Sequence, residues 1–171
     1  VDPCIAQNWS ETEDYTINVS TGEEPEPEYC IPPNPTFNDS TGITNVTLEN
    51  INNSTTGAGT YKDYTAMVAN VEAGETYPLA IKVDTQGNYY VNAMAWIDWD
   101  RDGTFDADEA YDLGQAHNVP DGAPSLSPAN IEIPVDALGN YRLRVRGSFG
   151  QTTVVDPCIA QNWSETEDYT I

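Results

Sequence analysis

The segment YYVNAMAWIDW, residues 89–99, decides the fold class. Apolar side chains stand at both odd and even positions of this segment, so a strand formed by it would have two apolar faces. A strand that is apolar on both faces belongs in the interior of a sheet. We therefore expect residues 89–99 to form a central strand.

Segments on both sides of this strand alternate between apolar and polar residues, as half-buried strands do. Further strands are expected at residues 44–52, 61–70, 77–83, 131–135, 141–145 and 168–171. Glycine- and asparagine-containing turns separate them, and no segment shows a long helical period. Seven or eight short strands predict an all-β fold, a β-sandwich with jelly-roll-like connectivity.

Three basic residues, Arg142, Arg144 and Arg146, share one face of an expected strand. Tyr141 and the other apolar residues of that strand take the opposite face. We expect the arginine face to be solvated and paired with nearby carboxylates. The alternative is a subunit contact that receives the acidic surface of another domain.

The chain is strongly acidic, with 6 Lys and Arg against 28 Asp and Glu in 171 residues and a net charge of −22. This charge excludes a protein that binds the phosphates of nucleic acids, and it disfavours docking on anionic membranes. No stretch approaches the 18 or so consecutive apolar residues that a membrane span needs. The chain starts at Val1 without a signal peptide, which indicates a mature form or an excerpt.

Residues 1–17 and residues 155–171 are identical, both reading VDPCIAQNWSETEDYTI. The simplest explanation is a tandem array with a repeat unit of 154 residues, which is the offset between Val1 and Val155. The alternative is a fusion scar. On the array hypothesis, residues 1–19 are the last strand region of a preceding repeat. Residues 20–28 are then a semi-stiff Pro/Glu linker, and residues 29–171 a complete domain.

The central strand runs into the sequence DWDRDGTFDADE, which begins at Asp98. It matches the twelve-residue EF-hand calcium loop, with oxygen ligands at alternate positions and a glycine, Gly103, at the sharp turn. The expected calcium ligands are Asp98, Asp100, Asp102, the Thr104 carbonyl, Asp106 and Glu109. A strand rather than a helix precedes this loop, so we expect the ion to have a structural role. The alternative is an acidic turn without metal; magnesium and zinc fit less well.

The cysteines are Cys4, Cys30 and Cys158, and Cys4 and Cys158 are copies of one repeat position. Two cysteines per unit are typical of secreted, disulfide-bonded proteins. The preferred pairing joins Cys30 to Cys158 and would stabilise the domain by roughly 4–5 kcal/mol through chain entropy. The alternative joins Cys4 to Cys30 across the linker.

Several motifs in this order resemble the GEVED domain, a module of secreted and cell-surface bacterial proteins. They are Tyr29-Cys30, YKDYT at 61–65, WIDWDRDGTF at 96–105, RLRV at 142–145 and SETEDYT at 164–170. The resemblance covers nearly all of residues 29–171, although Ser164 and Thr166 replace the Gly and Val of the family's name motif. It implies an extracellular β-rich module with paired cysteines at its ends, and no established catalytic activity.

The acidic residues of that motif, Glu165, Glu167 and Asp168, allow two interpretations. Glu165 and Glu167 would share one strand face, and one interpretation is a glycosidase-like carboxylate pair. We favour a structural role, in which they cap a turn or support the calcium loop. The protein is therefore not expected to be an enzyme.

Asn-x-Ser/Thr sequons are more frequent than chance predicts, which favours glycosylation of an extracellular surface. They begin at Asn8, Asn18, Asn38, Asn45, Asn52, Asn53 and Asn162. The sequence Asp39-Ser40-Thr41 resembles a bacterial motif for hydroxyl-linked glycans, so the glycan chemistry stays open. The alternative is a polar β-protein whose turns are rich in asparagine.

Together these features predict the structural repeat unit of an extracellular or cell-surface fibre, stabilised by calcium and glycosylated. Its expected partners are further copies of itself, with glycans as a second possibility. The alternative is a multivalent adhesin or carbohydrate-binding module, in which Trp9, Trp163, Tyr89 and Tyr90 would stack on sugars.

Overall fold

The computed structural model describes residues 15–16, 27–33, 42–56, 60–150 and 155–171. The regular structure of these residues consists of strands and one short 3₁₀ turn, η1 (Ala107–Glu109). The strands are β1 (Gly42–Leu48), β2 (Ile51–Ser54), β3 (Tyr61–Val68), β4 (Thr76–Asp84), β5 (Tyr90–Asp98), β6 (Ala110–His117), β7 (Ala129–Glu132), β8 (Arg142–Phe149) and β9 (Ser164–Thr170). This described part of the chain contains no helix with the length and apolarity that crossing a membrane requires.

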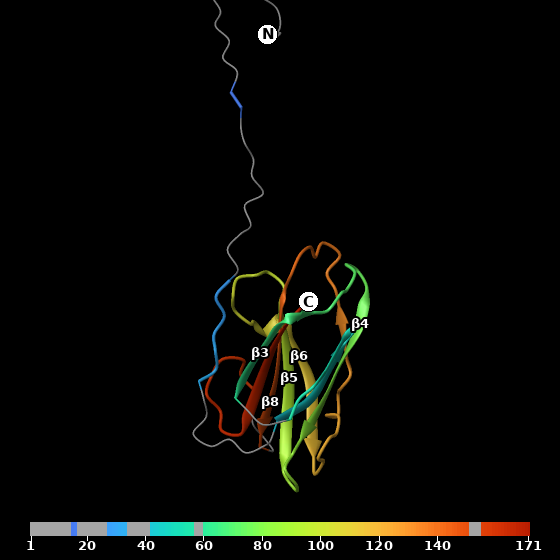
Figure 1. Ribbon diagram of the computed structural model, residues 1–171, viewed down its shortest axis with the longest axis vertical. Coiled ribbons are helices and arrows are strands. Elements are labelled where there is room, and N and C mark those ends of the chain that lie inside the picture. Colours follow the sequence, from blue (N-terminus) through green and yellow to red (C-terminus); the bar gives the residue numbers. More distant parts are fainter. Residues whose placement is uncertain (1–14, 17–26, 34–41, 57–59, 151–154) are drawn as a thin grey trace, which may run out of the picture.

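The strands form two sheets, with the orders β2-β1-β4-β7 and β3-β9-β8-β5-β6. The two sheets face each other (Figure 1). All paired strands are antiparallel except β3 and β9, which run parallel at one side of the larger sheet. The all-β, two-sheet architecture is therefore confirmed. The jelly-roll connectivity is not, because jelly rolls are built from antiparallel Greek keys and this sheet contains a parallel pair.

One hydrophobic core lies between the two sheets. The β4 residues Leu79 and Val83 contribute fully buried side chains from the smaller sheet, and Ala95 and Ile97 of β5 do so from the larger one. The alternation read from the sequence places these residues on the inner faces. Burying both inner faces against each other is what holds the two layers together.

A second, smaller core lies on the outer face of the larger sheet. There Trp96 of β5 packs in one cluster with Phe105 and Val155, and the ring of Tyr29 stacks on Phe105 at 5.4 Å between centroids. Strand β5 is thus interior to its sheet and apolar on both faces, as its sequence predicts.

Several strand bounds differ from the sequence-based expectation, and β9 for example begins at Ser164 instead of residue 168. Two differences are larger. The single strand expected at 44–52 is a hairpin, since the chain turns at Glu49, which has a φ of +49°, and then pairs β1 with β2. Strand β6 was not expected, because its sequence AYDLGQAH lacks clear alternation. Backbone pairing with the long neighbour β5 stabilises β6, and this pairing is irregular near Gly114, which has a φ of +82°.

Candidate functional site: an acidic loop and a buried charged strand

The acidic loop begins where β5 ends, at the fully buried Asp98. The Asp98 carboxylate accepts hydrogen bonds from the backbone N–H groups of Asp102 (3.3 Å) and Gly103 (3.0 Å). Carboxylate oxygens of Asp98, Asp100 and Asp102 all lie within 4.8 Å of one another. The spacing of alternate residues therefore brings three carboxylates to one point, as the sequence predicts.

The sharp turn of the loop depends on Gly103, which has a φ of +85°. A Cβ atom built on this residue would also lie 3.0 Å from the backbone carbonyl of Glu28, tighter than ordinary van der Waals contact. Both conditions favour glycine at this position. The segment at residue 28 thus packs directly against the acidic loop.

Glu109, the last predicted ligand, lies across the same loop and is only 7% exposed. Its two carboxylate oxygens accept hydrogen bonds from the backbone N–H groups of Trp99 (2.6 Å) and Asp106 (3.2 Å). Burial raises the pKa of the Glu109 carboxyl, and the nearby Asp98 charge adds to that rise, whereas these backbone bonds oppose it. The loop therefore concentrates several carboxylates in a small volume.

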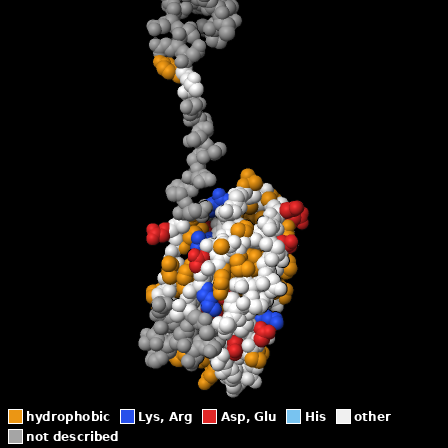
Figure 2. Space-filling model, viewed as in Figure 1, with side chains coloured by type: hydrophobic (Ala, Val, Ile, Leu, Met, Phe, Trp, Pro, Cys, Tyr) orange, Lys and Arg blue, Asp and Glu red, His pale blue; other side chains and the backbone are white. Residues whose placement is uncertain are grey.

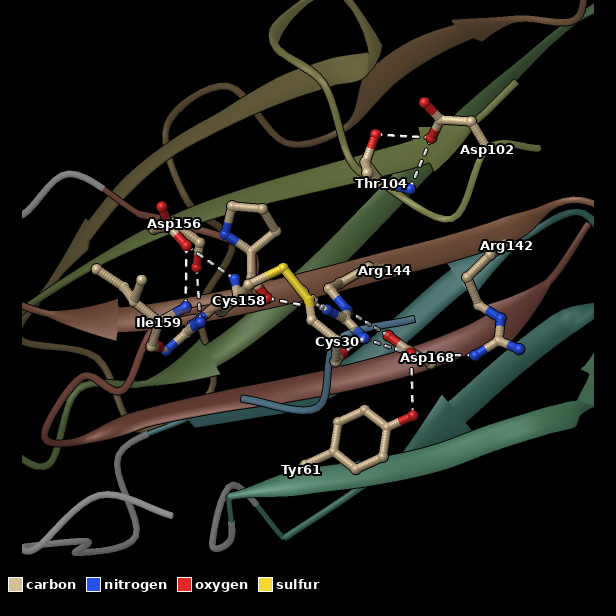
Figure 3. Close-up of a disulfide and its surroundings, with 12 residues drawn as sticks. Cys30, Tyr61, Asp102, Thr104, Arg142, Arg144, Asp156, Cys158, Ile159 and Asp168 are labelled. Carbon is tan, nitrogen blue, oxygen red and sulfur yellow. Dashed lines mark hydrogen bonds and ion pairs between the residues drawn. A yellow bond between two sulfur atoms is a disulfide. The ribbon is translucent and has the colours of Figure 1, made fainter. Parts of the chain in front are cut away.

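The remaining two predicted ligands, Thr104 and Asp106, are exposed on the rim of the loop. Thr104 donates to Asp102 Oδ1 from its backbone N–H (2.7 Å) and from its hydroxyl (2.6 Å), as Figure 3 shows. These bonds lower the pKa of the Asp102 carboxyl. All six predicted ligands thus lie in one tight loop, and calcium binding to it stays a prediction.

A disulfide joins Cys30 to Cys158 with a Cα–Cα distance of 5.7 Å, which is the pairing preferred from the sequence. It links the first described segment of the domain to the loop before β9 (Figure 3).

The disulfide lies beside Arg144, which is fully buried. Arg144 forms a two-pronged ion pair with the buried Asp168, from Nε to Oδ1 at 2.7 Å and from Nη2 to Oδ2 at 2.8 Å. The same guanidinium donates to the backbone carbonyls of Cys30 (2.8 Å) and Pro157 (2.9 Å). Arg144 therefore ties together β8, β9 and both disulfide-linked segments.

Arg146 is also buried, at 1% exposure. It donates to the backbone carbonyls of Asp156 (2.6 Å) and Ile159 (2.7 Å), and burial lowers its pKa to about 10. The expected solvated arginine face is therefore wrong for Arg144 and Arg146, and neither residue is accessible for a subunit contact. The disulfide-linked segments cover this face, which the alternation of β8 by itself does not reveal.

Asp168 is the centre of this polar cluster. Besides Arg144, it accepts hydrogen bonds at Oδ2 from the Tyr61 hydroxyl (2.9 Å) and from Arg142 Nη1 (3.2 Å), and the three partners surround it in Figure 3. Burial, together with the Asp168 charge, raises the pKa of Tyr61 to about 12. Asp168 thus joins β9 to β8 and β3.

Glu165 and Glu167 occupy the opposite face of β9, toward the smaller sheet, and both are fully buried. Lys62 Nζ lies 2.5 Å from Glu165 Oε1, and the backbone N–H of Ile43 donates to Glu165 Oε2 at 2.7 Å. The Tyr169 hydroxyl donates to Glu167 Oε2 at 2.7 Å. Desolvation raises the pKa of Glu167 to about 7, and the neighbouring Glu165 charge contributes.

These contacts correct both interpretations of the acidic motif. Glu165 and Glu167 share a strand face, as expected, but they lie inside the sandwich, where a sugar cannot reach them. Their partners Lys62 and Ile43 belong to β3 and β1, so they do not support the acidic loop at Asp98 either. A signal in the sequence that could have shown this burial is the strand phase, which places Glu165 and Glu167 on the same face as Tyr169 and Asp168 on the other face.

Four of the seven sequon asparagines lie in the described residues: Asn45, Asn52, Asn53 and Asn162. Asn52 and Asn162 are exposed. The amide nitrogen of Asn45 donates to Asn52 Oδ1 (2.9 Å), and that of Asn53 donates to the Tyr169 hydroxyl (2.8 Å), so a glycan there would displace an existing contact. Asn8, Asn18 and Asn38 lie outside the described residues.

The fold and the contacts of β9 define a disulfide-closed, all-β module whose acidic motif is part of its interior. The family model of the GEVED domain matches residues 92–171. The matched range begins within β5 and ends after the acidic motif. Strands β1 to β4 precede that range, yet they complete the same core. Neither the curated proteins nor the solved structures gave a match.

Proposed function

We propose that this chain is the structural repeat unit of an extracellular, calcium-stabilised fibre. The observation that carries the proposal is the identity of residues 1–17 with residues 155–171. In the second copy, this sequence supplies the disulfide-linked loop at Cys158 and strand β9, which lies inside the larger sheet. A segment that completes one domain is therefore repeated ahead of the linker, which supports domains joined in series.

The disulfide suits a module that carries tension. A force applied along the chain enters at Cys30 and passes through the disulfide to Cys158, which lies 128 positions later, so the chain between the two cysteines is bypassed. The load then falls on β9, which is hydrogen-bonded on both sides, to β3 and to β8. Extending β9 requires these bonds and the Arg144–Asp168 pair to break together, which favours mechanical resistance.

Calcium is the cofactor that we propose for the acidic loop. Hard Ca²⁺ takes six to eight oxygen ligands, and the carboxylates of Asp98, Asp100 and Asp102 converge there as such a site needs. The proposed set is completed by the Thr104 carbonyl and by the side chains of Asp106 and Glu109. Because the loop packs on the segment at Glu28, an ion there would stabilise the entry of the chain into the domain.

Glycans at the exposed Asn52 and Asn162 would agree with an extracellular location, and the disulfide supports the same location.

Electron microscopy of the native material tests the fibre proposal. The expected image is a regular filament whose density repeats once per 154-residue unit, with glycan density at exposed asparagines. Separate beaded chains that bind glycans would contradict the fibre and favour an adhesin instead.

The second candidate is that adhesin, a carbohydrate-binding module displayed in several copies. One cluster of aromatic residues supports it. Tyr89, which is 52% exposed as a whole residue, packs its ring on Phe149, and Phe149 packs on Trp163, with 5.2 Å between centroids in both contacts. Exposed aromatic rings are suited to stacking on sugars. Glycan-array binding that is lost in Tyr89→Ala and kept in Tyr15→Ala would support this candidate.

A further inference from the structure

A groove of about 370 Å³ opens at the end of β9, directly beside Ile171. Figure 1 marks the C-terminus at this end of the two sheets. Its walls are largely apolar and include Val68, Val71, Ile133, Ala137 and Leu138. Among them, Val68 and Leu138 are 40% and 79% exposed. The structure thus leaves an apolar groove in line with its last strand.

The strand leading to this groove is paired on both sides up to its last residue. On one side, the Ala69 N–H donates to the Thr170 carbonyl at 2.9 Å. On the other, Tyr141 and Ile171 exchange two backbone hydrogen bonds, of 2.8 and 3.0 Å. Both flanking segments continue past these bonds, through Asn70 and through Asn140, and both line the groove. A chain that follows Ile171 would therefore run between them.

The alternation of β9 determines which following residue would enter the groove. Tyr169 and Ile171 point into the core, at 0% and 4% exposure, whereas Thr170 lies on the other face. The next inward position is two residues after Ile171. In the first copy of the repeat, Ile17 is followed by Asn18, Val19 and Ser20, so this inward position corresponds to Val19.

We propose that the groove beside Ile171 binds the side chain of the valine that follows two positions later in the repeat sequence. β9 then continues in its own domain for two more residues before the linker begins. The inference rests on the proposed repeat array for the identity of the occupant, and on the pairing of β9 for its path. A branched apolar side chain there covers the exposed Val68 and Leu138, and the added backbone extends the pairing with both neighbours.

The test uses the 171-residue chain lengthened at its C-terminus by Asn-Val-Ser, compared with the same chain lengthened by Asn-Ser-Ser. The two chains differ only at the residue that is proposed to enter the groove, and both extensions move the terminal carboxylate by the same three residues. Burial of the valine is expected to raise the melting temperature by about 3–8 °C over the serine control. In NMR spectra, the methyl groups of the added valine should show contacts with Ile133 and Ala137.

Equal melting temperatures, or valine methyl groups without contacts to the groove, would overturn the proposal. A gain that grows with protein concentration would also overturn it, because it would identify a second copy as the occupant. None of these results depends on fibre formation. The groove proposal can therefore be wrong while the fibre proposal is right. A domain that binds the valine in its groove can still belong to a beaded adhesin.

Discussion

At the scale of single residues, the ion pair between Arg144 and Asp168 holds the disulfide-linked segments on the outer face of the larger sheet. Both side chains are fully buried, so removing one leaves the other charge without its main partner. Replacing Arg144 by Met should lower the free energy of unfolding by about 3–5 kcal/mol. Urea unfolding followed by tryptophan fluorescence measures this loss.

The matched control for that variant is Arg142→Met. Arg142 also pairs with Asp168, at 3.2 Å, but its side chain is 21% exposed and water can replace it. Its loss should cost about 1 kcal/mol or less. Equal losses of unfolding free energy in the two variants would show that burial of the Arg144–Asp168 pair does not determine its contribution to stability.

Glu167 makes the stability of the domain depend on pH. Burial raises its pKa from the ordinary 4.5 to about 7 in the folded protein, so between these values the folded state binds more protons than the unfolded state. The free energy of unfolding should therefore fall as pH rises from about 4.5 to 7 and change little above that. Glu167→Gln, which cannot ionise, should reduce this fall and be more stable than the parent at pH 8.

Thermal unfolding of the parent and of Glu167→Gln across pH 4.5–8 checks this expectation. Glu165 also has a raised pKa, mainly through burial, although Lys62 opposes the rise, so some pH dependence should remain in the variant. Parallel profiles for the two proteins would mean that Glu167 is not the group that titrates.

At the scale of elements, the acidic loop between β5 and β6 is expected to need its ion. Carboxylates within 4.8 Å repel one another, and a cation that binds only the folded loop stabilises it. Calcium at one hundred times its Kd should add about 2.7 kcal/mol to the free energy of unfolding. Asp100→Asn should lose most of this gain.

The control for the loop is Asp108→Asn, which removes the same charge from the same loop outside the predicted ligand set. It should keep the gain, as measured by melting temperature with calcium and with chelator. If the parent melts at one temperature under both conditions, the loop is an acidic turn without a structural metal.

At the scale of the whole molecule, the net charge of −22 opposes compaction. On the face shown in Figure 2, acidic and basic side chains lie scattered rather than gathered in one patch. Monovalent salt should therefore screen a diffuse repulsion, and raising NaCl from about 20 to 500 mM should raise the melting temperature.

This salt effect should persist in Asp100→Asn with chelator present, which separates general screening from calcium binding. A melting temperature that falls as salt rises would indicate that attractive pairs, such as Lys82–Asp121 at 2.9 Å, outweigh the net repulsion.

The repeated segment also behaves differently in its two copies. Tyr169 is fully buried in β9, whereas its counterpart Tyr15 is 80% exposed. The same sequence is therefore not sufficient to bury this tyrosine, which needs the sheet that β3 and β8 provide. The array hypothesis further predicts that residues 13–19 insert as a strand into the sheet of a neighbouring unit, and most of these residues lie outside the described ones.

Local patterns in the sequence determined the all-β class, the interior position of β5 and the convergence of the three aspartates. Each of these follows from alternation or from fixed spacing along the chain. Only the tertiary structure decided what covers each strand face. Alternation places Arg144 opposite Leu143, but it cannot show that the segments around Cys30 and Cys158 bury the arginine. Those segments have no regular period, and burial there comes from contacts between residues far apart in sequence.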